Sequence, residues 1–441
     1  MTARLRAEVI AIGDELTSGQ RLDTNSQWIS TQLAILGVPV IFHTTVTDTL
    51  GEGVEAFRIA TQRADLVVAT GGLGPTADDL TRDVLAALCG VPLELSVPVL
   101  KVIETRFLTR QAPMVESNRR QALFPHGSRI IPNPNGTAPG IELDVSRLDG
   151  QKSSRVFALP GVPSEMRSMW HDSVVACIHQ MQPEESTIVY RRIKCFGAGE
   201  SAIEDMLPDM IRRDRDPLVG ITAHEATVTL RIAARGRSVA DCLNKIEPTE
   251  EMIRSCLGRL VFGTEDDEVE DAALLALSTG RHTLALIEIG TDGRAAALLS
   301  QAQGRQLRDV LNAAQPGQQA VAPGGFCGGI VLPLATLSPK MRPPFLADWQ
   351  TALDMDSDTT SIENLAQRAQ VFFGTSIGLA IGAIRPAVDG KSTVSIGIAY
   401  AGKTESFVHY LGGDMSFALS RAAKTALNVV RELVAPFHST L

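Results

Sequence analysis

Residues Asp65–Leu88, DLVVATGGLGPTADDLTRDVLAAL, predict a strand, a glycine-rich turn and a helix in direct succession. Leu66–Thr70 is a short unbroken apolar run, which is typical of a strand covered on both faces in a parallel sheet. After the turn, apolar residues repeat at i+4 until Gly90, as expected of a helix: Leu80, Val84 and Leu88. Thr76 with Asp79 forms a capping-box pattern at the start of this helix, and Asp78 is an equally good N-cap.

The turn between the strand and the helix has the composition of an anion-binding loop. Gly71, Gly72 and Gly74 have no Cβ atom, so their backbone N–H groups can approach a ligand closely, and Pro75 fixes the exit of the turn. The helix N-terminus that follows adds unpaired N–H groups and the positive end of the helix dipole. The pattern therefore predicts a phosphate site at this turn.

The same turn is acidic. Asp78, Asp79 and Asp83 lie in or near the first turns of the expected helix, with Asp79 and Asp83 on one face at i+4. Bare carboxylates would repel a phosphate, so the pattern predicts a Mg²⁺-type ion that bridges aspartates and a phosphorylated ligand. The alternative is that acidic residues simply favour helix N-termini. The glycine turn directly before them favours the ligand site.

Length and composition limit the number of domains, the kinds of partner and the cellular location that we expect. A chain of 441 residues predicts about three domains. The net charge of −9, without a long Lys/Arg cluster, argues against a nucleic-acid or anionic-membrane partner. Six scattered cysteines without C-x-x-C spacing predict reduced and mostly buried thiols. With no apolar leader and no run of membrane-spanning length, we expect a cytoplasmic protein.

The first third of the chain alternates strands and helices. Ala7–Ile12 and Val38–Val46 are predicted strands, Asn25 is a predicted N-cap for a helix that ends at Gly37, and Glu52–Arg63 is a second predicted helix. This spacing indicates a doubly wound parallel α/β sheet. Ligands of such sheets bind outside the carboxyl ends of the strands, where Gly13–Glu15 and the glycine turn would lie.

Two further groups of polar residues are candidates for this edge. Asp14 and Glu15 are either cation ligands or partners for a sugar hydroxyl, or else a solvated loop in which Asp14 caps the next element. Asn118–Gln121 offers amide and guanidinium donors suited to phosphate or ribose. A solvated helix end is the alternative for either arginine taken alone.

Thr70–Thr81, TGGLGPTADDLT, resembles the signature of the molybdopterin-binding superfamily in the form found in the CinA family, the competence/damage-inducible proteins. Six further segments are similar to CinA in the same order and extend the resemblance over roughly the first 260 residues: Ala11–Leu16, Asp23–Ser30, Asn118–Pro125, Pro132–Gly140, Leu159–Met166 and Phe196–Asp205. In this resemblance the loops Pro132–Gly140 and Leu159–Pro163 form the walls of the pocket, with Gly136 at the ligand.

The resemblance implies that residues 1–175 form the molybdopterin-binding-like domain and hydrolyse ADP-ribose to AMP and ribose 5-phosphate with a divalent metal, Mg²⁺, Mn²⁺ or Co²⁺. Asp78 and Asp79 would hold the metal and act in catalysis. The other implied substrate-binding residues are Gly71, Gly72, Gly74, Thr76, Asp14, Glu15, Asn118 and Gly136. The resemblance also implies a homodimer. The alternative is a non-catalytic protein that binds a pterin or nucleotide.

Residues 176–263 match the small α+β middle module of CinA, sometimes described as KH-like. Glu200–Arg213 and Val239–Leu257 are predicted helices, the second interrupted at Pro248, and Leu218–Thr222 and Ala226–Ala234 are predicted strands. The G-x-x-G clamp of RNA-binding KH domains is absent and the region is not basic, so we expect a spacer or dimerisation module.

Residues 264–441 resemble the C-terminal α/β domain of the family, a nicotinamide mononucleotide deamidase. Thr283–Gly293 keeps Glu288, Thr291 and Gly293 but has Ile289 where the family has a nucleophilic serine. Deamidase activity is therefore predicted to be absent, and a pseudoenzyme domain used for assembly or regulation is expected. Gln301–Gly329, rich in Gln, Gly and Pro, lacks the Walker Gly-Lys-Ser/Thr ending and is predicted to be a flexible surface loop.

Overall fold

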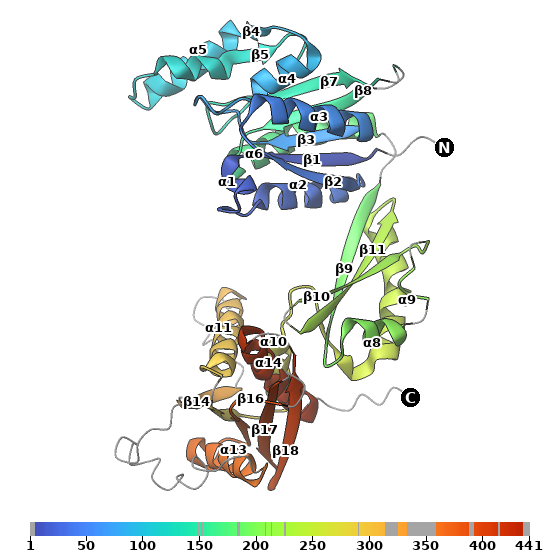
Figure 1. Ribbon diagram of the computed structural model, residues 1–441, viewed down its shortest axis with the longest axis vertical. Coiled ribbons are helices and arrows are strands. Elements are labelled where there is room, and N and C mark those ends of the chain that lie inside the picture. Colours follow the sequence, from blue (N-terminus) through green and yellow to red (C-terminus); the bar gives the residue numbers. More distant parts are fainter. Residues whose placement is uncertain are drawn as a thin grey trace. The chain divides into compact units, whose positions relative to one another are not determined.

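A computed structural model shows an α/β protein (Figure 1). It describes residues 5–148, 150, 153–182, 186–207, 209–212, 214–224, 226–289, 291–313, 325–332, 359–387, 392–412 and 415–434. Contacts divide the chain into two compact units, one of Met1–Tyr190 with Ala233–Glu247 and one of Arg191–Ile232 with Pro248–Leu441. The predicted boundaries of three domains stay a prediction.

The N-terminal unit is built on a six-stranded sheet of order β2-β1-β3-β8-β7-β6. The first four strands run parallel, and β7 and β6 are antiparallel to their neighbours. The strands are β1 (Ala7–Ile12), β2 (Val40–Val46), β3 (Leu66–Thr70), β6 (Arg129–Ile131), β7 (Gly140–Ser146) and β8 (Ser153–Leu159). The helices are α1 (Asp14–Thr17), α2 (Thr24–Ile35), α3 (Leu50–Arg63), α4 (Thr81–Cys89), α5 (Val97–Thr109), η1 (Glu116–Ala122), α6 (Pro163–Met169), η2 (Trp170–Val174) and α7 (Val175–Met181), and β4 (Leu93–Leu95) pairs with β5 (Leu123–Pro125).

Helices cover both faces of this sheet. Successive side chains of a strand point to opposite faces. Accordingly Leu66 and Val68 of β3 pack in a core with residues of α2, α6 and η2, whereas Val67 and Ala69 pack in a second core with residues of α3 and α4. All five residues of β3 are buried. The structure thus confirms the predicted doubly wound fold, with β3 covered on both faces.

Two predicted helix starts are wrong. Helix α4 begins at Thr81, with Leu80 at the N-cap and no side-chain cap, so residues 71–80 form a longer turn than expected. Helix α2 is capped by Asp23, whose carboxylate accepts a hydrogen bond from the Ser26 N–H, and not by Asn25. Asn25 instead makes tertiary contacts, and the Thr76–Asp79 pair forms within the turn ahead of the helix, as described below.

A four-stranded sheet of order β10-β11-β9-β12 follows in sequence. Its elements are β9 (Thr187–Phe196), α8 (Glu200–Asp205), β10 (Leu218–His224), β11 (Thr227–Gly236), α9 (Val239–Leu257), η3 (Gly258–Leu260) and β12 (Val261–Thr264). Helix α8 is shorter than predicted. Helix α9 runs through Pro248 without a break, so the predicted interruption is wrong.

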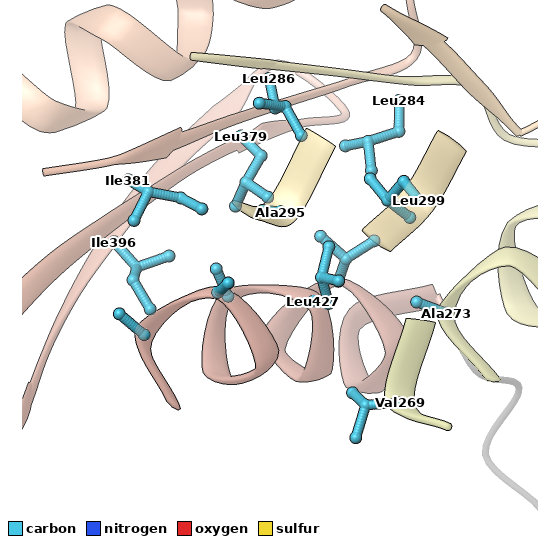
Figure 2. Close-up of a cluster of buried hydrophobic side chains, with 14 of the residues drawn as sticks. Val269, Ala273, Leu284, Leu286, Ala295, Leu299, Leu379, Ile381, Ile396 and Leu427 are labelled. Atoms are coloured by element: carbon cyan, nitrogen blue, oxygen red, sulfur yellow. The ribbon is translucent and has the colours of Figure 1, made fainter. Parts of the chain in front are cut away.

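The C-terminal sheet has the order β14-β13-β15-β17-β16, with β18 paired to β17. Its elements are α10 (Val269–Thr279), β13 (Leu284–Ile289), α11 (Arg294–Ala313), β14 (Phe326–Leu332), α13 (Thr359–Phe373), β15 (Ile377–Ile381), β16 (Arg385–Pro386), β17 (Ser392–Tyr400), β18 (Lys403–Leu411) and α14 (Met415–Val434). Figure 2 shows one face of this sheet, where Leu284 and Leu286 of β13 pack with Leu299 of α11 and Leu427 of α14. The opposite face, with Ala285 and Ile287, packs on α13.

Two further predictions, one about the loop Gln301–Gly329 and one about the cysteines, need correction. Most of the predicted loop Gln301–Gly329 is regular structure, because helix α11 continues to Ala313 and β14 begins at Phe326, and residues 314–324 lie outside the described residues. All six cysteines are free thiols, but only Cys195 and Cys242 are buried, while Cys256 and Cys327 are exposed. Among the described residues, no helix is both long and apolar enough to cross a membrane.

Candidate active site

A cavity of about 610 Å³ lies at the carboxyl ends of β1, β3 and β8. Loops that follow these strands form most of its wall, together with the start of α2, in agreement with the ligand edge of an open α/β sheet. Of the predicted site residues, the cavity is lined by Gly71, Gly72, Gly74, Asp78, Asp79 and Glu15. Asp14, Thr76, Asn118 and Gly136 lie close in sequence to lining residues but do not line it.

The glycines of the turn are required first by the fold. Gly71 and Gly72 have φ values of 112° and 64°, which side-chain-bearing residues rarely adopt. A Cβ atom on Gly71 would collide with the carbonyl of Ile12, and one on Gly72 with the hydroxyl of Thr81. The Gly71 N–H donates to the Leu159 carbonyl at 3.1 Å and is not available to a ligand.

The N–H groups of the next three residues of the turn differ from that of Gly71 in their hydrogen bonding. Within the described part of the chain, the N–H groups of Gly72, Leu73 and Gly74 form no hydrogen bond, and all three residues line the cavity. Buried backbone donors normally have a partner. Leu73 is buried and the two glycines are half-buried, so the turn has three backbone donors without a partner in the described chain, on residues that line the cavity. A phosphate at this turn stays a prediction.

Arg82 supports this turn from inside the protein. The side chain is only 2% exposed, and its guanidinium donates to the carbonyls of Leu73 at 2.9 Å and Gly74 at 3.5 Å. Burial lowers the pKa of Arg82 to about 10, while Asp79 opposes that shift. The sequence analysis missed this residue, because a charged residue in a helical pattern gives no sign that it turns inward.

The two aspartates predicted to hold metal differ in their surroundings. Asp79 accepts hydrogen bonds from the Thr76 N–H at 2.8 Å and from the Thr76 hydroxyl, so the capping-box pair forms but closes the turn ahead of α4. Asp78 is exposed, and a hydrogen bond from Thr76 lowers the pKa of its carboxyl below the usual range. Asp83 does not line the cavity, and it pairs with Arg120 at 2.9 Å.

A third carboxylate at this edge, Asp48, was not predicted. It follows β2 and lines the cavity. The Asp14 N–H donates to its Oδ2 at 2.8 Å, and its own N–H donates to Asp14 Oδ1 at 3.2 Å. Burial raises the pKa of Asp48, and the charges of Asp14, Asp78 and Glu15 raise it further. The rule that ligands lie beyond strand ends, applied to the predicted strand Val38–Val46, would have found it.

Asn118 and Gly136, which were predicted to bind the substrate, do not line the cavity. Asn118 is buried in η1, and Gln121 of the same helix lines the cavity instead. The Gly136 N–H donates to Asn133 Oδ1 at 2.8 Å, and its carbonyl accepts a hydrogen bond from Arg106. The next two residues of that loop, Thr137 and Ala138, line the cavity.

Asn25, which is not a helix cap, joins two walls of the cavity. Its Nδ2 donates to the hydroxyl of Thr70 at 3.1 Å and to the carbonyl of Gly161 at 2.9 Å. Thr70 in turn donates to the Pro160 carbonyl at 3.1 Å. The end of β3 and the loop after β8 are thereby held at the start of α2.

The cavity is strongly acidic. Arg21, 4.0 Å from Glu15, is the one cation among the described lining residues. The lining carboxylates are Glu15, Asp23, Asp48, Asp78, Asp79 and Glu165. Carboxylate oxygens are the ligands that Mg²⁺ prefers, and Mg²⁺ is commonly held by one or two carboxylates together with substrate phosphates. The donor set fits that mode. Among the described residues no group of three or more His, Cys, Asp or Glu side chains is placed to hold an ion by itself.

In the C-terminal unit, Glu288 and Ile289 form the end of strand β13. Ile289 packs against the core formed with α13. Glu288 is fully buried, and its carboxylate accepts hydrogen bonds from Thr291 Oγ1 at 2.7 Å and from the N–H groups of Ala295 and Ala296 at 3.1 and 2.7 Å.

The fold and the cavity define a molybdopterin-binding-like α/β protein, and comparison with known proteins agrees. A family model described as a probable molybdopterin binding domain matches residues 8–180, and one described as the damage-inducible protein CinA KH domain matches residues 190–263. The chain belongs to the CinA family of competence-damage inducible proteins.

Relatives match over nearly the whole chain. A competence-damage inducible protein of Thermoanaerobacter pseudethanolicus is 32% identical over 97% of this chain and 98% of its own length, and a CinA-like protein of Nostoc sp. is 31% identical over 97% and 99%. The crystal structure of CinA from Thermoplasma acidophilum, titled as a protein of unknown function, covers 40% of this chain and 98% of its own, with 35% identity and a TM-score of 0.36.

Proposed function

We propose that the N-terminal unit is a divalent-metal-dependent nucleotide pyrophosphatase that hydrolyses ADP-ribose or a similar nucleotide. The observation that carries this proposal is the pairing, in one cavity, of unpaired backbone N–H groups on the glycine turn with the carboxylates of Asp78 and Asp79. The N–H groups favour phosphate oxygens, and the carboxylates exclude them unless a cation lies between. A pyrophosphate bound with a metal ion satisfies both.

The residues would divide the task between them. The N–H groups of Gly72, Leu73 and Gly74 would bind phosphate oxygens in the direction fixed by Arg82 behind the turn. Asp78 and Asp79 would hold the metal ion, which supplies charge neutralisation on the pyrophosphate and activation of water when bound. Glu15 and Asp48 would accept hydrogen bonds from ribose hydroxyls.

The test is hydrolysis of ADP-ribose, NAD, FAD and nicotinamide mononucleotide by the full chain with Mg²⁺, Mn²⁺ or Co²⁺. The variant is Asp78→Asn/Asp79→Asn, since an asparagine at position 79 can still accept the Thr76 N–H. Asp83→Asn is the matched control, because Asp83 is near in sequence but does not line the cavity. We expect metal-dependent release of AMP and ribose 5-phosphate, a loss of roughly 100-fold or more in the double variant, and a near-normal control. Absence of hydrolysis, or an active double variant, would overturn the proposal.

A second candidate is a non-catalytic protein that binds a nucleotide or pterin. It is favoured by two observations: Asp79 already accepts two hydrogen bonds from Thr76, and the described residues contain no set of three metal-ligating side chains. Binding of ADP-ribose without turnover under any of the three metals would support this candidate. We also propose that the C-terminal unit lacks deamidase activity, since Ile289 has no nucleophilic atom.

A further inference from the structure

Among the residues that the structure describes, the cavity wall contains a buried amide without a hydrogen-bond partner. Gln121 lies in η1, is only 2% exposed and lines the cavity. Its Oε1 atom is buried without a hydrogen-bond partner, and within the part of the chain that the structure describes its side chain forms no hydrogen bond at all. Most buried side-chain polar atoms have a partner, so this one requires an explanation.

The amide is costly to the fold and contributes no polar contact to it. Leaving a buried polar group unpaired destabilises the folded state, because the group loses its hydrogen bonds to water and gains none in the protein. Its neighbours fix the position of η1 independently of that amide: Ala122 is completely buried, and Arg120 bonds to Asp83 at 2.9 Å and to the Thr76 carbonyl at 3.3 Å. The fold therefore holds Gln121 at the cavity without using its hydrogen-bonding atoms.

We propose that Gln121 determines ligand specificity, with its side-chain amide binding a ligand group that presents a hydrogen-bond donor and an acceptor side by side. A glutamine amide offers one acceptor oxygen and two N–H donors. The amino-purine edge of adenine is complementary to such an amide, and a ribose diol presents the same donor and acceptor chemistry. This inference rests on the proposed nucleotide function, because both groups belong to ADP-ribose.

A neutral amide suits this role in an acidic cavity. Asp78, Asp79 and Arg21 respond mainly to charge, and so to the phosphates or a metal ion. An uncharged group is instead recognised by whether it satisfies a buried donor and acceptor. A site built around such atoms rejects an analogue that leaves them unpaired much more strongly than an apolar pocket does. Gln121 is thus suited to distinguish ligands that carry the same phosphates.

The chain offers a matched control in Gln182. Its Oε1 is also buried without a hydrogen-bond partner, but its Nε2 donates to the Leu36 carbonyl at 3.4 Å and the residue does not line the cavity. Both glutamines belong to the same compact unit. Replacing each by methionine, which has a similar length and shape, separates an effect on ligand binding from the general effect of removing a buried amide.

The experiment is calorimetric titration of the full chain with ADP-ribose, AMP, IMP and ribose 5-phosphate, together with thermal unfolding without ligand, for the wild type, Gln121→Met and Gln182→Met. We expect Gln121→Met to bind ADP-ribose at least about 10-fold more weakly, with a Tm equal to or above that of the wild type, because a buried unpaired group is removed. Gln182→Met should bind like the wild type. Loss of a preference for AMP over IMP identifies the base as the contact, and weaker binding of ribose 5-phosphate identifies the sugar.

Three results would overturn the inference, each in a different way. If Gln121→Met binds ADP-ribose as tightly as the wild type does, Gln121 does not contact the ligand, and the proposed function stands. A lower Tm with unchanged binding would likewise show a purely structural role. If the wild type binds none of the four compounds, the proposed nucleotide function fails, and the assignment of Gln121 fails with it.

Discussion

The two units each contain a parallel strand that leads through a turn into a helix, but the two turns end differently. In the N-terminal unit, β3 is followed by a turn over residues 71–80, α4 has no side-chain cap, and turn N–H groups lining the cavity have no partner within the described residues. In the C-terminal unit, β13 is followed after four residues by α11, and the carboxylate of Glu288 accepts the Ala295 and Ala296 N–H groups.

The difference is that the C-terminal unit supplies its own anion. Glu288 occupies the helix N-terminus at which an external anion would bind. The residues kept from the family pattern, Glu288, Thr291 and Gly293, therefore maintain the turn whether or not a nucleophile is present. Retention of a motif in this unit reports on folding, whereas the donors of the N-terminal turn, unpaired within the described residues, are the groups that we propose a ligand binds.

The largest effect is expected from Glu288→Ala. It leaves two helix N–H groups and the Thr291 hydroxyl without their acceptor in a fully buried place, so we expect a loss of about 3 kcal/mol in the stability of the C-terminal unit. Denaturant unfolding with hydrogen exchange read on α11 measures it. Glu288→Gln, which keeps an acceptor oxygen, should lose less. Equal stability of Glu288→Ala and the wild type would show that the carboxylate does not hold the turn.

Arg82→Met tests whether the N-terminal turn depends on its internal support. The change removes the donors to the Leu73 and Gly74 carbonyls, and two buried carbonyls without partners cost about 2 kcal/mol. We expect weaker ADP-ribose binding together with faster hydrogen exchange at residues 72–74. Arg58→Met, which removes an exposed arginine paired with Glu55, is the control. Unchanged binding in Arg82→Met would mean that the turn keeps its shape alone.

Ile289→Ser tests whether a serine hydroxyl at this position is sufficient to give the C-terminal unit deamidase activity. We expect a stability loss of about 1 kcal/mol, because a partly buried apolar side chain is removed from the core with α13, and no release of ammonia from nicotinamide mononucleotide. The adjacent Glu288 carboxylate already accepts hydrogen bonds from Thr291, Ala295 and Ala296, so it is not available as a base for a serine. Measurable deamidation by this variant would show that the rest of that active site persists.

The smallest effect is a pH dependence carried by Asp48. Its folded-state pKa is raised, so its contribution to stability is present at low pH and is lost as the pH rises through the folded pKa. Asp48→Asn should therefore raise Tm at pH 7. The gain in the free energy of unfolding should be less than about 1 kcal/mol, because Asp48 is partly exposed, and it should shrink towards pH 3. A gain that grows on acidification would contradict the sign of this shift.

The sequence was sufficient for features that depend on local pattern. The apolar run Leu66–Thr70 predicted a strand covered on both faces, and the alternation of strands and helices predicted the doubly wound sheet. Strand-end rules also placed Glu15 and the glycine turn at one edge. These follow from periodicity and from backbone freedom at glycine, which each short segment carries by itself.

Long-range contacts decided the rest. Asn25 bonds to Thr70 and Gly161, 45 and 136 residues away, and so it does not cap a helix. Arg82 turns inward to the Leu73 and Gly74 carbonyls, and Gln121 rather than Asn118 reaches the cavity. The sequence by itself determined which edge of the sheet carries the site. Only the tertiary structure decided which polar atoms there are already paired, because pairing depends on partners that the local sequence does not specify.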